Sequence, residues 1–123
     1  MDQHRIRTLV VDDSSIAQKT ICSYLSDQKT VEVIGTASNG PQALDKVQAL
    51  NPELVLLDIQ MPVMNGLEVT HQLRKRFPLI RVILVSIDDG QELRISCESC
   101  GADGFVSKIR LPELGSEIRR IFA

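Results

Sequence analysis

Leu54-Val55-Leu56-Leu57-Asp58 is a continuous apolar run that ends in a single carboxylate. A strand with one face in water alternates apolar and polar residues, whereas an unbroken apolar run is typical of a strand buried on both faces. Residues 8–11 and 80–85 form similar runs, and residues 31–37 and 105–106 are further strand candidates. Burial on both faces predicts a parallel sheet covered by helices.

Between these strands, apolar residues recur at helical spacing, over residues 14–26, 39–50, 65–77, 89–100 and from 112 onward. Asn39 is a good helix N-cap with proline in the first turn after it, and Gly101 is a natural C-terminal cap. The pattern therefore predicts five strand–helix units. Right-handed crossovers fold such units into a doubly wound three-layer α/β sandwich.

Length and charge exclude several classes of protein. The chain has 123 residues, 43% of them hydrophobic, with 14 basic and 16 acidic side chains, so one domain with a sizeable core is expected. The near-neutral balance argues against direct nucleic-acid binding, and Arg74-Lys75-Arg76 is interpreted as a solvated helix end. No apolar run approaches the ~20 residues of a membrane span, and the N-terminus lacks a signal-peptide core. We therefore expect a cytoplasmic protein.

The cysteines do not form a recognisable framework. Cys22, Cys97 and Cys100 are an odd set, which argues against a secreted disulfide scaffold. Zinc needs four ligands, and neither His4 nor His71 is placed to complete a site around the Cys97-x-x-Cys100 pair. A redox pair usually opens a helix, whereas this one closes the predicted helix 89–100. We interpret the two as small, partly buried residues.

Polar residues end four of the predicted strands, at Asp12-Asp13, Asp58, Ser86 and Lys108. In a doubly wound sheet the carboxyl ends of the strands meet at one rim, which is where function is found. Carboxylates crowded there repel one another unless a cation is present, and an oxygen-only set suits Mg²⁺. A hydroxyl and an ammonium group can hold a phosphoryl group, and one free carboxylate could form an acyl phosphate with it.

Simpler interpretations of single residues stay open at this point. Asp12-Asp13 taken alone could cap the first helix, because acidic side chains favour helix N-termini. Ser86 alone would usually be a structural hydroxyl, and Phe105 alone would usually be core. By contrast, Asp58 at the end of an apolar run is hard to explain by packing.

The motifs together resemble the receiver domains of two-component response regulators. The matching residues are Asp12-Asp13, Leu56-Leu57-Asp58-Ile59-Gln60-Met61-Pro62 with Asn65-Gly66, Leu84-Val85-Ser86, and Gly101-Ala102-Asp103-Gly104-Phe105-Val106-Ser107-Lys108. The resemblance covers about residues 8–122. It implies a flavodoxin-like (βα)5 fold with strand order 2-1-3-4-5. It also implies a single receiver domain over residues 1–123, with no output domain in this chain.

The resemblance also implies a role for each rim residue. Asp58 matches the phosphoryl acceptor of the family. Asp12 and Asp13 match the Mg²⁺ site, to which Asp58 and the backbone carbonyl of Gln60 would contribute further ligands. Mg²⁺ is thus the implied cofactor.

Ser86 and Lys108 match the family residues that contact the phosphoryl group, and Phe105 matches an aromatic switch. A histidine kinase is the implied donor, and the surface of the fourth helix, fifth strand and fifth helix would change on phosphorylation. A partner, an output domain or a second copy of the chain would read that surface. The resemblance therefore implies a signalling module that catalyses only its own phosphorylation and dephosphorylation.

Two residues depart from the family pattern. Ile87 stands where the family usually has alanine or another small residue, so we expect it to crowd an acyl phosphate and slow its exchange. Ile109 stands where many members have proline after a cis bond, and we expect a trans bond here because a cis bond would cost ~3–4 kcal/mol. Residues 74–78 and 104–108 resemble the branch of the family that precedes helix-turn-helix DNA-binding output domains.

Two other functions compete with the switch. One is a receiver-like binding scaffold whose phosphorylation site is closed by Ile87, although Asp13, Asp58 and Lys108 are all present. The other is a Mg²⁺-dependent phosphohydrolase, which needs a second aspartate soon after the nucleophile, where this chain has Ile59-Gln60. A dinucleotide binder is disfavoured, because no glycine-rich phosphate loop follows the first strand.

Overall fold

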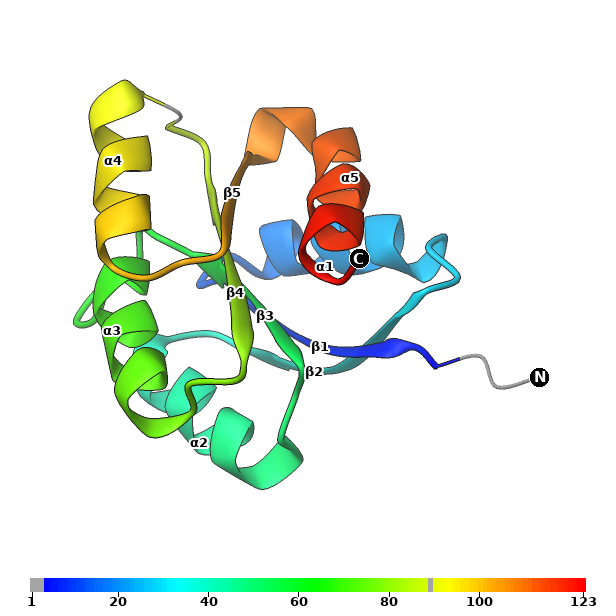
Figure 1. The fold of residues 1–123 in the computed structure, drawn as a ribbon, viewed down its shortest axis with the longest axis horizontal. Coiled ribbons are helices and arrows are strands. Elements are labelled where there is room, and N and C mark those ends of the chain that lie inside the picture. Colours follow the sequence, from blue (N-terminus) through cyan, green and yellow to red (C-terminus); the bar gives the residue numbers. More distant parts are fainter. Residues whose placement is uncertain (1–3, 89) are drawn as a thin grey trace.

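A computed structural model describes residues 4–88 and 90–123, and it is a three-layer α/β/α sandwich (Figure 1). All strand pairs of its sheet are parallel. The five strands lie in the order β2-β1-β3-β4-β5, as the sequence analysis predicted. Their bounds are β1 Ile6–Val11, β2 Val31–Ala37, β3 Leu54–Asp58, β4 Arg81–Ser86 and β5 Gly104–Ser107.

Helices cover both faces of the sheet. In Figure 1, α1 and α5 lie on one face, and α2, α3 and α4 lie on the other. Their bounds are α1 Ser15–Ser26, α2 Gly40–Leu50, α3 Gly66–Arg76, α4 Gln91–Ser99 and α5 Pro112–Ile121, with a short 3₁₀ turn, η1, at Lys108–Arg110. The doubly wound architecture expected from the sequence is confirmed.

The apolar run 54–58 is buried along its whole length, in the middle of the sheet. Successive side chains of a strand point to opposite faces, so each face of β3 needs its own apolar layer. Val55 and Leu57 pack into the core beneath α2, α3 and α4. Leu54 and Leu56 pack into the second core, beneath α1 and α5. Two cores on one strand explain why the run does not alternate.

Local capping sets several helix ends. Asn39 accepts a hydrogen bond from the Gln42 backbone N–H at 2.8 Å, which starts α2. Asn65 and Glu68 form a reciprocal capping box at the start of α3. Gly101 adopts φ 96° and follows the last turn of α4, as expected for a glycine C-terminal cap.

Some element boundaries differ from the prediction or lie beyond the described residues. β1 starts at Ile6, two residues before the predicted run, because pairing with β2 already begins there. α4 starts at Gln91, and the predicted start at Asp89 lies outside the described residues.

No described helix is long and apolar enough to cross a membrane.

The cysteine pair lies where the sequence analysis placed it, at the end of α4. Cys97 is 2% exposed, and burial together with the neighbouring Cys100 raises the pKa of its thiol to about 11. Cys100 is half-buried, and its thiol donates to the Cys97 carbonyl at 3.0 Å. The Cys97 thiol is therefore protonated and unreactive at neutral pH, and the burial of the pair is in keeping with a packing role.

The interpretation of Arg74 as a solvated residue is wrong. Its side chain is only 22% exposed, and it pairs with Asp103 on the loop between α4 and β5. Its guanidinium also donates to the backbone carbonyls of Gly101 at 2.7 Å and Ile80 at 2.6 Å. The sequence places Arg74 at a helix C-terminus, but only the packing of α3 against that loop supplies these acceptors. Lys75, by contrast, is exposed as expected.

Candidate functional site

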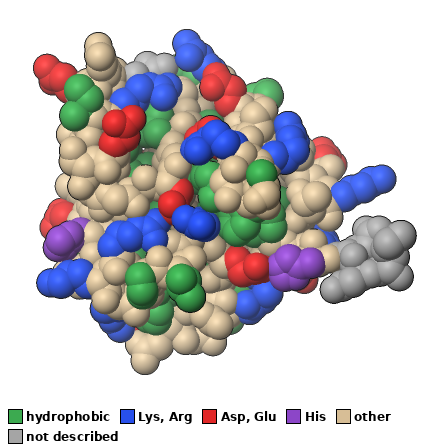
Figure 2. Space-filling view, in the orientation of Figure 1, with side chains coloured by type: hydrophobic (Ala, Val, Ile, Leu, Met, Phe, Trp, Pro, Cys, Tyr) green, Lys and Arg blue, Asp and Glu red, His purple; other side chains and the backbone are tan. Residues whose placement is uncertain are grey.

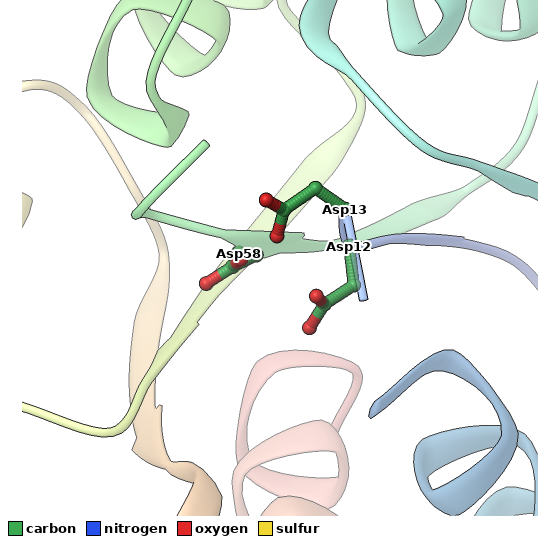
Figure 3. Close-up of side chains that lie close together, drawn as sticks. All are labelled: Asp12, Asp13 and Asp58. Atoms are coloured by element: carbon green, nitrogen blue, oxygen red, sulfur yellow. The ribbon is translucent and has the colours of Figure 1, made fainter. Parts of the chain in front are cut away.

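Three carboxylates meet at the carboxyl ends of β1 and β3. One oxygen each of Asp12, Asp13 and Asp58 lies within 4.8 Å of the others (Figure 3). Asp12 and Asp58 are buried, at 0% and 4% exposure, whereas Asp13 is exposed to solvent. The rim predicted from the sequence therefore brings these three residues together.

Lys108 reaches into this group from the far side of β4, at the start of η1. Its Nζ lies 2.7 Å from Asp12 Oδ2 and 3.3 Å from Asp58 Oδ1. The hydroxyl of Ser107 accepts the Ile109 backbone N–H at 3.2 Å and so starts the turn that carries the lysine. The described residues contain no cis peptide bond, so the bond before Ile109 is trans, as expected.

The electrostatics of the site follow from burial and from the neighbouring charges. Burial, followed by the charge of Asp12, raises the pKa of Asp58 from 3.8 to about 6. Lys108 and the Gln60 backbone N–H, which donates to Asp58 Oδ1 at 3.3 Å, act in the opposite direction. Burial lowers the pKa of Lys108, but its contacts with Asp12 and Asp58 outweigh this and raise it. Asp58 is thus a carboxylate of raised basicity that remains mostly ionised at neutral pH.

The donor set fits a hard divalent cation. Asp12 Oδ1 accepts the Ser14 backbone N–H at 2.9 Å. Its buried Oδ2 has no hydrogen-bond partner of good geometry among the described residues, although the Lys108 ammonium lies close to it. A buried carboxylate oxygen that is short of hydrogen bonds, with two further carboxylates within reach, matches the oxygen-only coordination that Mg²⁺ prefers.

Ser86 is the last residue of β4 and is fully buried at the same rim. Its hydroxyl accepts the Asp88 backbone N–H at 3.2 Å. Phe105 is half-buried on the neighbouring strand, β5, where it pairs with Leu84. Ile87 follows Ser86 and is 62% exposed, so its side chain lies at the surface of the rim and is not part of the core.

The loop after Asp58 folds back closely on the strand. A Cβ at Gly66 would lie 2.4 Å from the Asp58 carbonyl oxygen, so only glycine fits at the start of α3. The Gly66 N–H donates to the Ile59 carbonyl at 2.8 Å. Within this loop Val63 has φ 72°, a left-handed conformation that is strained for a β-branched residue. This fold-back holds Asp58 and Gln60 at the rim.

Sequence reasoning missed Gln18. The two N–H groups of its side-chain amide are shared among three acceptors, the Asp12 carbonyl at 2.6 Å, the Ala37 carbonyl at 3.0 Å and Ser38 Oγ at 3.2 Å. The amide therefore ties the peptide between Asp12 and Asp13 to the end of β2. A glutamine in the middle of an amphipathic helix carries no signal in the sequence, because its partners lie on a different strand.

Comparison with known proteins places this geometry in a family context. The model of the response regulator receiver domain matches residues 8–119. The response regulator domain of CheB from Thermotoga maritima is 31% identical, with a TM-score of 0.88 and 98% of both chains covered. The signal receiver domain of the putative response regulator NarL from Mycobacterium tuberculosis is 30% identical, with a TM-score of 0.87 and 95% of both chains covered.

Longer curated proteins also share the sequence. The protein-glutamate methylesterase/protein-glutamine glutaminase of Bacillus subtilis is 44% identical over 105 residues, which are 84% of this chain and 29% of the relative. Response regulator GacA of Pseudomonas viridiflava is 35% identical over 119 residues, or 96% of this chain and 56% of the relative. The chain thus spans less than a third of the methylesterase and about half of GacA.

Proposed function

The chain belongs to the response regulator receiver domain family, and we propose that it is a phosphorylation-controlled switch with Asp58 as the phosphoryl acceptor. The observation that carries the proposal is the position of Asp58, which is buried at the end of β3 beside Lys108 and within 4.8 Å of two more carboxylates. A solvated surface aspartate would have none of these neighbours. The donor would be a histidine kinase or a small phosphodonor.

The chemistry is an in-line transfer. A carboxylate oxygen of Asp58 attacks the phosphorus, the bond from phosphorus to the donor atom breaks, and that atom leaves with the electron pair. A histidine nitrogen then takes a proton from water, whereas a carboxylate leaving group such as acetate remains an anion. Mg²⁺, held by Asp12, Asp13, Asp58 and the Gln60 backbone carbonyl, would neutralise charge on the phosphoryl oxygens when it is bound. Lys108, already 3.3 Å from Asp58, would hold another of these oxygens.

Ser86 and Phe105 would carry the signal outward. The buried hydroxyl of Ser86 lies at the same rim, and its hydrogen bond from the β4–α4 loop can be exchanged for one to a phosphoryl oxygen. Phe105 would follow into the space that Ser86 leaves. The surface of α4, β5 and α5 then has two arrangements, and phosphorylation biases the choice between them.

For the partner that recognises this surface, we propose a class of protein and no individual protein. Solved relatives include a DNA-binding response regulator of the LuxR family from Staphylococcus aureus, and curated relatives include methylesterases. We propose that residues 1–123 are one receiver domain that controls an output domain of one of these kinds, or a separate partner. A second copy of the chain is the further candidate.

A receiver-like scaffold is the weaker alternative. Such a scaffold has no need to keep three carboxylates within 4.8 Å of one another and an ammonium group paired with two of them, and this chain holds all four close together. Because Ile87 is 62% exposed, its side chain can move aside at little packing cost.

The test is the intact mass of the protein after incubation with Mg²⁺ and acetyl phosphate. We expect one labile phosphoryl adduct that requires the metal and is lost in Asp58→Asn. Asp45→Asn removes the same charge from an exposed position on α2 and should keep the adduct. Beryllofluoride, a phosphoryl mimic, needs no donor recognition. If neither an adduct nor beryllofluoride binding is detected, the proposal is contradicted.

A further inference from the structure

A guanidinium group lies over the aromatic ring of β5. Arg94, in the second turn of α4, places its Cζ 4.7 Å from the centroid of the Phe105 ring. This distance is within the range of a cation–π contact, in which a positive group is attracted to the electron-rich ring face. The contact joins α4 to β5 on the surface that the proposed function assigns to signalling.

The two side chains line a cavity of about 340 Å³ between α4, β5 and α5. Figure 2 views the molecule from the side on which α4 and α5 flank β5, and basic and acidic side chains lie next to one another across the middle of this face. Phe105 is half-buried and borders this cavity.

Glu117 of α5 supplies a fixed negative charge to the same cavity. Arg120 binds this carboxylate through two hydrogen bonds, in which its Nε and Nη2 donate to the two Glu117 oxygens at 2.9 and 3.0 Å. Arg120 also donates to the Asp103 carbonyl at 2.9 Å, which anchors the pair to the start of β5. Arg120, followed more weakly by the Phe105 backbone N–H and the charge of Arg94, lowers the pKa of Glu117, so this carboxylate is ionised at neutral pH.

We propose that Arg94 is a positioning residue that holds the Phe105 ring in its present place beside the cavity between α4, β5 and α5, with the Glu117 carboxylate on the same cavity keeping the guanidinium there. Inward movement of the ring would break the contact between Arg94 and the ring. A contact made in only one of two states shifts the equilibrium toward that state by its own free energy. Arg94 therefore makes the change caused by phosphorylation of Asp58 less favourable. Its side chain does so from a surface that is separate from the Asp58 site.

This inference rests on the proposed function and has a test that separates the two. The affinity of the chain for beryllofluoride is measured by calorimetry in the presence of Mg²⁺. We expect Arg94→Ala to bind about two- to fivefold more tightly than the wild type, which is the size that an exposed cation–π contact supports. Arg94→Lys keeps the charge and should lie between the two.

Two controls isolate the ring contact. Arg119→Ala removes another exposed arginine, which lies on α5 and donates to Ser116 Oγ at 3.4 Å, and it should leave the affinity unchanged. In a Phe105→Leu background, Arg94→Ala should have no further effect, because the ring through which Arg94 acts is absent. Thermal unfolding of each variant checks that the fold is intact.

The possible outcomes have distinct meanings. If the wild type binds beryllofluoride and Arg94→Ala binds it equally well, the role of Arg94 is overturned. If the gain persists in the Phe105→Leu background, Arg94 acts through its charge alone, and the ring-holding role is also overturned. If the wild type fails to bind beryllofluoride at all, the proposed function fails first.

Discussion

The ammonium group of Lys108 lies 2.7 Å from Asp12 Oδ2, closer than its distance of 3.3 Å to Asp58 Oδ1. In this structure the lysine is therefore chiefly the counter-ion of Asp12. Asp58 is left with weaker neutralisation in a buried position, which fits the rise of its pKa to about 6. An incompletely neutralised carboxylate is a better nucleophile than one held in a tight ion pair.

Removing the charge of Asp58 should stabilise the fold. The folded-state pKa of about 6 lies above the ordinary 3.8, so the ionised form is penalised by folding. We expect Asp58→Asn to raise the free energy of unfolding at pH 7 by up to about 3 kcal/mol. Wild-type Asp58 gains its proton in the folded state as the pH falls through about 6, so the difference should shrink there and vanish below about pH 4.

Urea denaturation between pH 4 and pH 7.5 measures this effect, and Asp45→Asn is the control for loss of an exposed charge. Mg²⁺ should raise the melting temperature of the wild type more than that of Asp58→Asn, because a ligand of the folded state stabilises it. If Asp58→Asn is less stable than the wild type at pH 7, the buried charge of Asp58 does not destabilise the fold and the prediction is contradicted.

Loss of the Gln18 amide should weaken metal binding without unfolding the protein. Gln18→Met keeps the length of the side chain but frees the Asp12 carbonyl, so the Asp12–Asp13 peptide can reorient. Groups that orient metal ligands typically contribute about tenfold or more to affinity, and we expect a loss of that order for Mg²⁺ by calorimetry. Gln42→Met is the matched control, because Gln42 holds the Ser38 backbone N–H at 3.0 Å in the adjoining loop. Equal losses in the two variants would point to a general loop effect.

Shortening Ile87 should speed phosphoryl exchange at Asp58. Its side chain is 62% exposed beside Ser86, so Ile87→Ala should change the free energy of unfolding by less than ~0.5 kcal/mol. Rates of phosphorylation by acetyl phosphate and of subsequent hydrolysis should both rise. Leu79→Ala truncates a side chain that is 92% exposed and lies before β4, at the opposite end of the strand, and it should alter neither rate. Unchanged rates in Ile87→Ala would refute the crowding hypothesis.

Arg74 should be a stability residue. Arg74→Met leaves Asp103, whose side chain is 19% exposed, without its main partner, and it also removes hydrogen bonds to two backbone carbonyls. We expect a loss of about 2–4 kcal/mol in urea denaturation. Arg74→Lys should recover only part of it, because an ammonium group lacks the planar fork of the guanidinium. Lys75→Met is the exposed neighbour that serves as control; a similar loss there would contradict the special role of Arg74.

Much of the fold was predictable because its signals are local. The apolar run ending at Asp58, the asparagine caps and Gly101 each act within a few residues, and together they fix the strands, the helices and their alternation. The start of β1 was misplaced because Ile6 and Arg7 join the sheet only through their pairing with β2. That pairing partner lies more than twenty residues away along the chain.

The carboxylate rim was predictable for a different reason. Parallel strands end at the same edge of a sheet, so polar residues that end such strands must meet. Asp12, Asp13, Asp58 and Lys108 were therefore found from the order of motifs alone. Arg74 was misjudged and Gln18 was missed, because each acts on backbone carbonyls of another element, which carry no residue-specific signal.

The sequence by itself determined the layer architecture, the strand order implied by its family, and the set of groups at the rim, because these depend on hydrophobic pattern and chain direction. Only the tertiary structure decided which carboxylate Lys108 approaches most closely, that Arg74 is mostly shielded from solvent and paired with Asp103, and that Arg94 lies over Phe105. Such choices depend on differences of about an ångström between side chains from separate elements. Packing sets those distances, and the linear pattern does not encode them.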